Sequence, residues 1–150
     1  MSRTARRLLA VTAGTLLAAP LVPGPLHAAP DHAGKTITTE LRGAAEVPGP
    51  GDPDGTGTAT VHLNPGLQRV CYTLEVTDVE QVTAAHIHVG DPTVAGPVVV
   101  PLDAPTDGMS SGCADADRAL LVDIVSNPDE YYVNVHSVAF PAGAVRGQLG

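Results

Sequence analysis

The chain is poor in aromatic and basic residues. It has no tryptophan, three tyrosines and one phenylalanine among 150 residues, whereas sugar-binding surfaces rely on aromatic side chains for stacking. Its eight lysines and arginines are outnumbered by 16 aspartates and glutamates, which gives a net charge of −8. A surface of this sign repels phosphate backbones. We therefore expect neither a sugar-binding nor a nucleic-acid-binding protein.

Motifs of hydrolytic enzymes are also missing. The sequence contains no GxSxG nucleophile elbow and no HExxH zinc motif, the arrangements that place a serine nucleophile or a metal with its base in common hydrolases. Carboxylates are numerous, but their placement gives no support to glycosidase chemistry. We expect a protein that is not an enzyme.

The first 28 residues are predicted to be an export signal. Arg3, Arg6 and Arg7 precede an apolar run over residues 8–22, and a small-residue cleavage site follows at Ala28. The run is too short to cross a membrane, which takes about 20 consecutive apolar residues. The Arg6-Arg7 pair is compatible with twin-arginine export, but the general secretory route is the preferred interpretation. We expect a secreted protein.

Residues 29–150 are expected to form one domain. They keep five basic residues against 16 acidic ones, a net charge of −11. The end of the sequence, Gln148-Leu149-Gly150, has no apolar tail, so we expect no membrane anchor. The expected partner is an unknown extracellular ligand or protein, and the sequence does not indicate an oligomeric state.

Short runs rich in valine, threonine and isoleucine alternate with proline and glycine, a pattern typical of an all-β protein. We expect an antiparallel sandwich or barrel with one short helix over 117–127, capped by Asp117 and stopped by Pro128. Residues 49–57 and 105–111 are expected to be loops. The expected strands are 36–41, 58–63, 69–76, 84–89, 98–102, 131–136 and 144–149.

The second and third of these strands form the clearest hairpin. Asn64-Pro65-Gly66 lies between them and has the composition of a compact turn. Alternation along the two strands predicts that one face of each is buried. The residues expected on these buried faces are Val61, Leu63, Tyr72, Leu74 and Val76.

Cys71 and Cys113 are the only cysteines. An exported protein with an even number of cysteines usually pairs them, so we expect a disulfide. The alternatives are a thiolate metal ligand or a free thiol, although neither cysteine belongs to a CxxC motif.

Three of the six histidines lie in two strand-like segments. Alternation places His86 and His88 on one face of their strand, and places His136 on one face of another together with Tyr132 and Asn134. If the strands are neighbours, the three imidazoles form a ligand set suited to copper or zinc, with Tyr132 and Asn134 orienting the rings. The alternative is that the histidines only pin the loop over 90–97 through hydrogen bonds.

Several short motifs follow one another in an order that resembles the CHRD domain, first described in chordin and widespread in exported bacterial proteins. The resemblance covers nearly all of residues 29–150. It implies an all-β fold, and most bacterial members have no assigned activity. Similar sequences also have Gly57, Cys71 and Cys113 at these places. The motifs are HIHVG (86–90), GPVVV (96–100), YYVNVHS (131–137), FPAG (140–143) and RGQL (146–149).

Glu46 and Arg146 match motif positions of the same family. The resemblance implies a buried or half-buried ion pair that joins the first and last strands, and the alternative is that both side chains are solvated. In the animal protein the repeats belong to an antagonist of extracellular growth factors. That partner does not carry over to an exported single-domain protein.

The His86-Ile87-His88 segment is also similar to the His-x-His copper ligands of Cu/Zn superoxide dismutases. The expected fold is accordingly immunoglobulin-like or dismutase-like, but no fourth bridging histidine and no second histidine cluster with an aspartate completes a dismutase site. The favoured hypothesis is a secreted, non-enzymatic CHRD protein that binds an unknown ligand at His86, His88 and His136. The alternatives are an extracellular copper or zinc protein with redox activity, and a purely structural envelope component.

Overall fold

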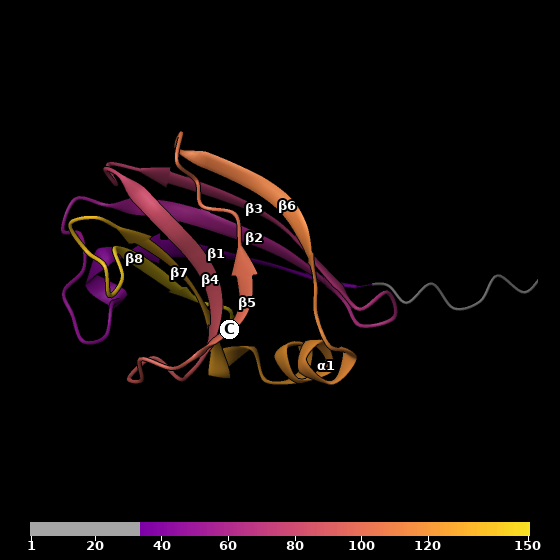
Figure 1. Cartoon of the computed structure of the whole chain (residues 1–150). Coiled ribbons are helices and arrows are strands. Elements are labelled where there is room, and N and C mark those ends of the chain that lie inside the picture. The colour runs from indigo at the N-terminus through magenta and orange to yellow at the C-terminus, as the bar shows by residue number, and fades with distance from the viewer. Residues whose placement is uncertain (1–33) are drawn as a thin grey trace, which may run out of the picture.

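A computed structural model describes residues 34–150, which form one eight-stranded antiparallel sheet that curls into a nearly closed barrel (Figure 1). The strand order is β5-β4-β7-β8-β1-β2-β3-β6. The all-β prediction is confirmed, in a barrel-like rather than a two-sheet form. The elements are β1 Lys35–Arg42, η1 Gly43–Ala45, β2 Thr56–Asn64, β3 Arg69–Thr77, β4 Val82–Val89, β5 Val98–Leu102, β6 Met109–Asp115, α1 Arg118–Ser126, η2 Pro128–Glu130, β7 Tyr131–Ser137 and β8 Val145–Gln148.

The predicted export signal lies outside the described residues. Within residues 34–150 no helix is long and apolar enough to span a membrane.

The barrel interior is apolar because alternate residues of every long strand point into it. In the β2–β3 hairpin, Val61 lies opposite Tyr72 and Ala59 opposite Leu74, and all four side chains are buried. The predicted buried faces of this hairpin are confirmed. The fully buried Ile87 of β4 and Val133 of β7 lie opposite each other in the same core.

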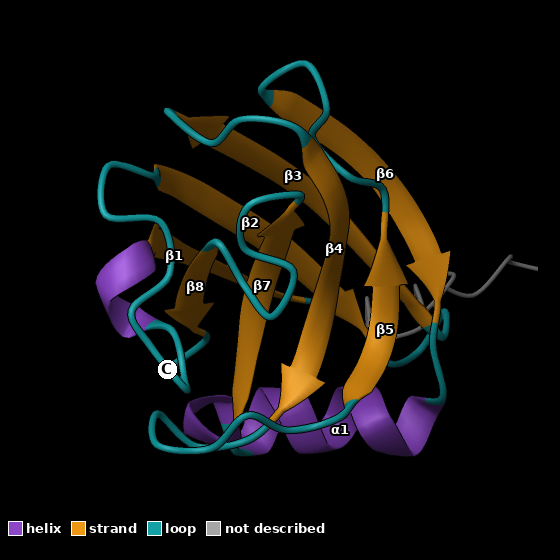
Figure 2. Cartoon of the chain, turned by 60° about the vertical axis from the view of Figure 1, so that its left-hand side comes forward, coloured by secondary structure: helices purple, strands orange, loops and turns teal. Residues whose placement is uncertain are grey.

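Helix α1 covers one end of the barrel (Figure 2). Its Asp117 cap accepts a hydrogen bond from the backbone N–H of Ala119, and its Leu121 and Ile124 side chains are fully buried in the core. The predicted helix and its cap are therefore confirmed. Pro128 begins η2, which leads directly into β7.

Strand β6 was not predicted, and the prediction that residues 105–111 form a loop is wrong at its end, because Met109 begins this strand. The sequence MSSGCAD has no apolar alternation, so nothing local indicates a strand. Pairing with β3 creates it: Gly112 lies opposite Tyr72, and a Cβ at 112 would approach the Tyr72 hydroxyl to 2.8 Å. The strand is thus specified by its neighbour rather than by its own pattern.

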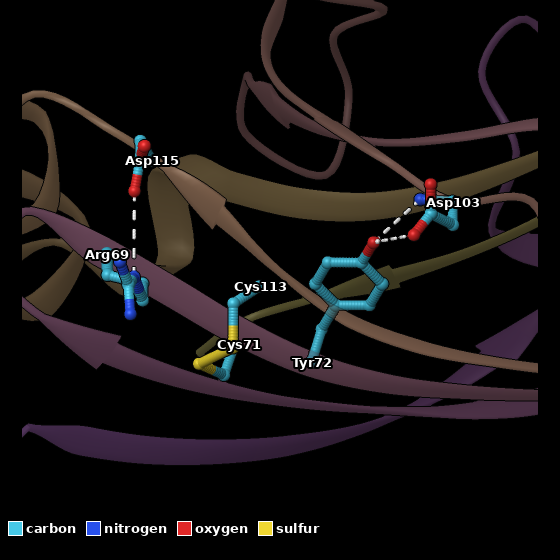
Figure 3. The surroundings of a disulfide bond; sticks show 6 residues. All are labelled: Arg69, Cys71, Tyr72, Asp103, Cys113 and Asp115. Atoms are coloured by element: carbon cyan, nitrogen blue, oxygen red, sulfur yellow. Dashed lines mark hydrogen bonds and ion pairs between the residues drawn. A yellow bond between two sulfur atoms is a disulfide. The ribbon is translucent and has the colours of Figure 1, made fainter.

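Cys71 of β3 and Cys113 of β6 lie directly opposite each other and form a disulfide (Figure 3). The predicted pairing is confirmed. The bond secures the edge strand β6, which pairs only with β3 in the sheet.

The seam between the two edge strands is closed by side chains. Tyr72 donates its hydroxyl proton to the Asp103 carboxylate at 2.9 Å and accepts from the Asp103 backbone N–H at 2.8 Å (Figure 3). Ser110 of β6 donates to the Asp103 carbonyl at 2.7 Å. Asp103 directly follows β5, so these three bonds join β3, β5 and β6.

Removing the disulfide is expected to destabilise the barrel without changing its topology. The cysteines are 42 positions apart, and a covalent loop of this length restricts the unfolded chain by about 3–4 kcal/mol. Cys71→Ser/Cys113→Ser should lower the free energy of unfolding in urea by that amount. Wild-type protein unfolded under reducing conditions serves as the control and should behave like the variant. A loss below about 1 kcal/mol would contradict the entropic role.

Candidate metal centre

The three histidines singled out from the sequence meet on one face of the sheet, opposite the apolar core. β4 carries His86 and His88, and its neighbour β7 carries His136. The register places His86 opposite Asn134 and Ala84 opposite His136, so the imidazoles converge diagonally across the two strands. One ring nitrogen from each histidine can be chosen so that all three lie within 4.8 Å of one another.

The spacing of these nitrogens suits a single metal ion. His86 Nδ1 and His136 Nε2 are 3.2 Å apart. Two imidazoles on one tetrahedral zinc ion, each at about 2.0–2.1 Å, have nitrogens roughly 3.3 Å apart. The centres of the His88 ring and the other two rings are 5.5 and 5.9 Å apart. The three rings therefore lie close enough to share one ion, with ring rotations that shorten the longer nitrogen separations.

Backbone carbonyls orient two of the rings. His88 Nδ1 donates to the carbonyl of Gly96 at 2.9 Å, and His136 Nδ1 donates to the carbonyl of Pro141 at 3.2 Å. Because a carbonyl only accepts, each bond assigns the proton to Nδ1 and leaves a lone pair on Nε2. Such a hydrogen bond behind a ligating imidazole is the usual support of a metal site.

His88 Nε2 is the atom most in need of a partner. The His88 side chain is buried, and its Nε2 has no hydrogen-bond partner. A buried acceptor without a partner costs free energy. This nitrogen lies beside two further imidazoles, and a metal ion bound by all three would give it a partner and remove that cost.

Burial favours the neutral form of all three imidazoles. Burial lowers the pKa of His86, His88 and His136 below the usual value of 6.5. Repulsion from the other two rings adds to the effect of burial on the His86 pKa, and the charge of Arg146 lowers the His88 pKa further. Neutral imidazole is the form that binds metals.

Tyr132 and Arg146 form a stack behind His88. The Tyr132 ring lies parallel to the His88 ring, with centres 4.9 Å apart and an angle of 11° between the planes. The guanidinium carbon of Arg146 lies 3.4 Å from the centre of the Tyr132 ring. The Tyr132 hydroxyl also accepts from the Gly96 backbone N–H at 3.1 Å, so it supports the residue whose carbonyl orients His88.

Comparison with known families agrees with the motifs in the sequence. A family model described as CHRD domain matches residues 37–149. The chain belongs to the CHRD-domain family. Searches of curated proteins and of solved structures find no match.

In this CHRD domain, the ion pair predicted between Glu46 and Arg146 is not formed. The ion pairs among residues 34–150 are Arg42–Glu40 and Arg69–Asp115. Arg146 instead donates to the carbonyls of Asp91 and Val94 at 2.7 and 3.0 Å. Stacking on Tyr132 directs the guanidinium toward these carbonyls rather than toward the carboxylate.

Asn134 does not orient a histidine, contrary to expectation. Its amide nitrogen donates to Glu46 Oε2 at 3.2 Å. Asn134 Oδ1 and Glu46 Oε1 are both buried without a partner. Burial raises the pKa of Glu46 to about 7, although the Asn134 bond and the Arg146 charge oppose the rise. The raised pKa favours the neutral, protonated form of this buried carboxyl group.

Several contributors to the site lie in the family motifs, but the sequence does not reveal what they do there. The carbonyls of Gly96 and Pro141 act through the backbone, whose direction depends on the loops around them. Gly96 is required for a steric reason, because a side chain there would collide with the Val89 carbonyl. The stacking role of Arg146 likewise depends on a strand pairing that only the folded sheet establishes.

The buried Glu46 is expected to make stability depend on pH. Its raised pKa means that the folded protein binds a proton that the unfolded chain, with the usual value of 4.5, has already lost. Stability therefore falls as the pH rises from about 4.5 through 7. Glu46→Gln, which keeps the shape without the charge, should stabilise the protein at pH 8 by about 1–3 kcal/mol.

The gain should shrink as the pH falls and vanish below about 4.5, as measured by urea denaturation across this range. Glu75→Gln removes an exposed carboxylate and serves as the matched control. An equal gain at every pH would show that the Glu46 carboxylate is not the titrating group.

Proposed function

We propose that this CHRD domain is an exported, non-enzymatic binding module that holds one copper or zinc ion on His86, His88 and His136. The observation that carries the proposal is the buried, unpartnered Nε2 of His88 beside two further imidazoles. Pinning of the loop uses only the Nδ1 of His88, so it does not account for a buried Nε2 beside two further imidazoles.

The donor set supports these two metals. Three neutral imidazoles suit copper and zinc, whereas calcium and magnesium prefer oxygen ligands. Three protein ligands also leave a coordination position for water or another small ligand. Because burial lowers the pKa of all three imidazoles below 6.5, protons compete little with the metal at neutral pH.

The surroundings support an exported protein that collects cations. The disulfide between Cys71 and Cys113 is the kind of bond that persists in oxidising compartments. The large excess of acidic residues attracts cations to the surface over distances of roughly 10 Å. Both features suit a domain that binds a metal ion outside the cytoplasm.

Removing the three imidazoles is expected to abolish tight metal binding. The purified chain should bind one equivalent of Cu(I), Cu(II) or Zn(II) in a titration against a competing chelator, and the His86→Ala/His88→Ala/His136→Ala variant should bind at least about 100-fold more weakly. Metal should also raise the melting temperature of the wild type and leave that of the variant unchanged.

His62→Ala is the matched control. His62 is exposed, bonds to the Thr36 hydroxyl at 2.8 Å and stands apart from the cluster, so its removal should not alter metal affinity. Equal affinities of the wild type and the triple variant would refute the proposed function. If neither the wild type nor the triple variant binds metal, and the triple variant is less stable, the histidines serve instead to hold the loop over 90–97.

A further inference from the structure

Arg146 is a buried cation without a carboxylate partner. Only 2% of its surface is exposed, and no carboxylate among residues 34–150 lies within ion-pair distance of it. Its guanidinium donates to two backbone carbonyls and to the Gln148 side-chain oxygen, which lies 3.3 Å away. All three acceptors are neutral, so its positive charge is uncompensated by direct contact.

This charge lies close to the proposed metal ligands. Tyr132 is on β7, between the strand that carries His88 and the strand that carries Arg146. Its ring contacts the His88 ring and the guanidinium. An aromatic side chain therefore separates the guanidinium from His88, and it screens the charge much less than water would.

Two acidic residues near Arg146 do not cancel its effect. The Asp91 side chain is only half-buried, and its carboxylate accepts hydrogen bonds from the Thr93 amide and hydroxyl. These bonds, rather than Arg146, are the main cause of the lowered pKa of Asp91. The Glu46 carboxylate is buried, and its pKa of about 7 leaves it mostly protonated at pH 6. At pH 6 the nearest buried charge to the three-histidine site is therefore the guanidinium.

We propose that Arg146 makes the three-histidine site selective for monovalent copper, Cu(I), over divalent ions such as Zn(II). The inference rests on the proposed metal site and concerns which ion that site prefers. Three neutral ligands add no negative charge, so a divalent ion beside the guanidinium is repelled twice as strongly as a monovalent one. Arg146 touches no ligand atom and acts as a specificity-determining residue through its charge.

Cu(I) and Zn(II) make a clean comparison because both have a filled d shell and therefore no geometric preference of electronic origin. A unit charge about 10 Å away, at an effective dielectric constant of about 20, changes affinity roughly tenfold for each unit of charge on the ion. The ratio of Zn(II) to Cu(I) affinity is compared between proteins that keep the same three ligands, so the intrinsic preferences of the two ions for ligand type and geometry cancel and the effect of charge remains.

The test measures both affinities at pH 6 with competing chelators, under anaerobic conditions for Cu(I). Arg146→Gln should raise Zn(II) affinity about tenfold more than Cu(I) affinity. Arg146→Lys is the matched control, because it keeps the charge while losing the planar stack and the forked hydrogen bonds. The lysine variant should retain the wild-type ratio. Ratios that move equally in both variants would assign Arg146 a structural role only and overturn the inference.

A second variant keeps the test decisive if Arg146→Gln does not fold. Gln148→Glu leaves Arg146 in place and introduces a carboxylate at a side chain that Arg146 already contacts. It should also raise the ratio of Zn(II) to Cu(I) affinity about tenfold, and an unchanged ratio in the folded variant would overturn the inference. Failure of the wild type to bind either ion would instead refute the proposed metal site itself.

Discussion

The buried guanidinium of Arg146 is the interaction on which the polar face of the barrel depends. It lies over the Tyr132 ring and donates to the carbonyls of Asp91 and Val94. These contacts tie the loop over 90–97 to β7 and β8. The same loop supplies the Gly96 carbonyl that orients His88. One side chain therefore fixes the position of the loop and, through the loop and the tyrosine, the direction of an imidazole.

The barrel separates stability from chemistry by using the two faces of the same strands. Ala85 and Ile87 of β4 are fully buried in the apolar core, and the two histidines between and beside them point to the other face. Alternation in an extended strand makes this division automatic. The apolar core stabilises the strands that hold the imidazoles. On the polar face, each buried donor or acceptor without a partner lowers the free energy of unfolding.

The motifs that relate the chain to CHRD domains lie far apart in the sequence but gather at this one face. HIHVG and YYVNVHS supply the histidines and Tyr132, and FPAG supplies the Pro141 carbonyl. The remaining motifs supply Gly96 and Arg146. We interpret the family signature as the description of a polar site and its supports, more than as a description of the barrel core.

Local patterns in the sequence determined a large part of the fold. Alternation, turn composition and an N-terminal cap predicted the hairpin of β2 and β3, the helix α1 and the faces of β4 and β7, because each of these depends on contacts within a few residues or within one strand. Strand β6 was missed, since its exposed sequence becomes a strand only through pairing with β3 and the bond between Cys113 and Cys71.

At the site, the sequence by itself determined which side chains share a face of a strand. Tertiary structure alone decided that β4 and β7 are neighbours, in a register that brings His86, His88 and His136 together. It also decided the partners of the buried ionisable groups. Arg146 donates to carbonyls and lies over an aromatic ring, and Glu46 accepts a hydrogen bond from Asn134. The physical reason is that burial obliges each polar group to find whichever partner the packed loops place within reach, and the linear order of residues does not specify that partner.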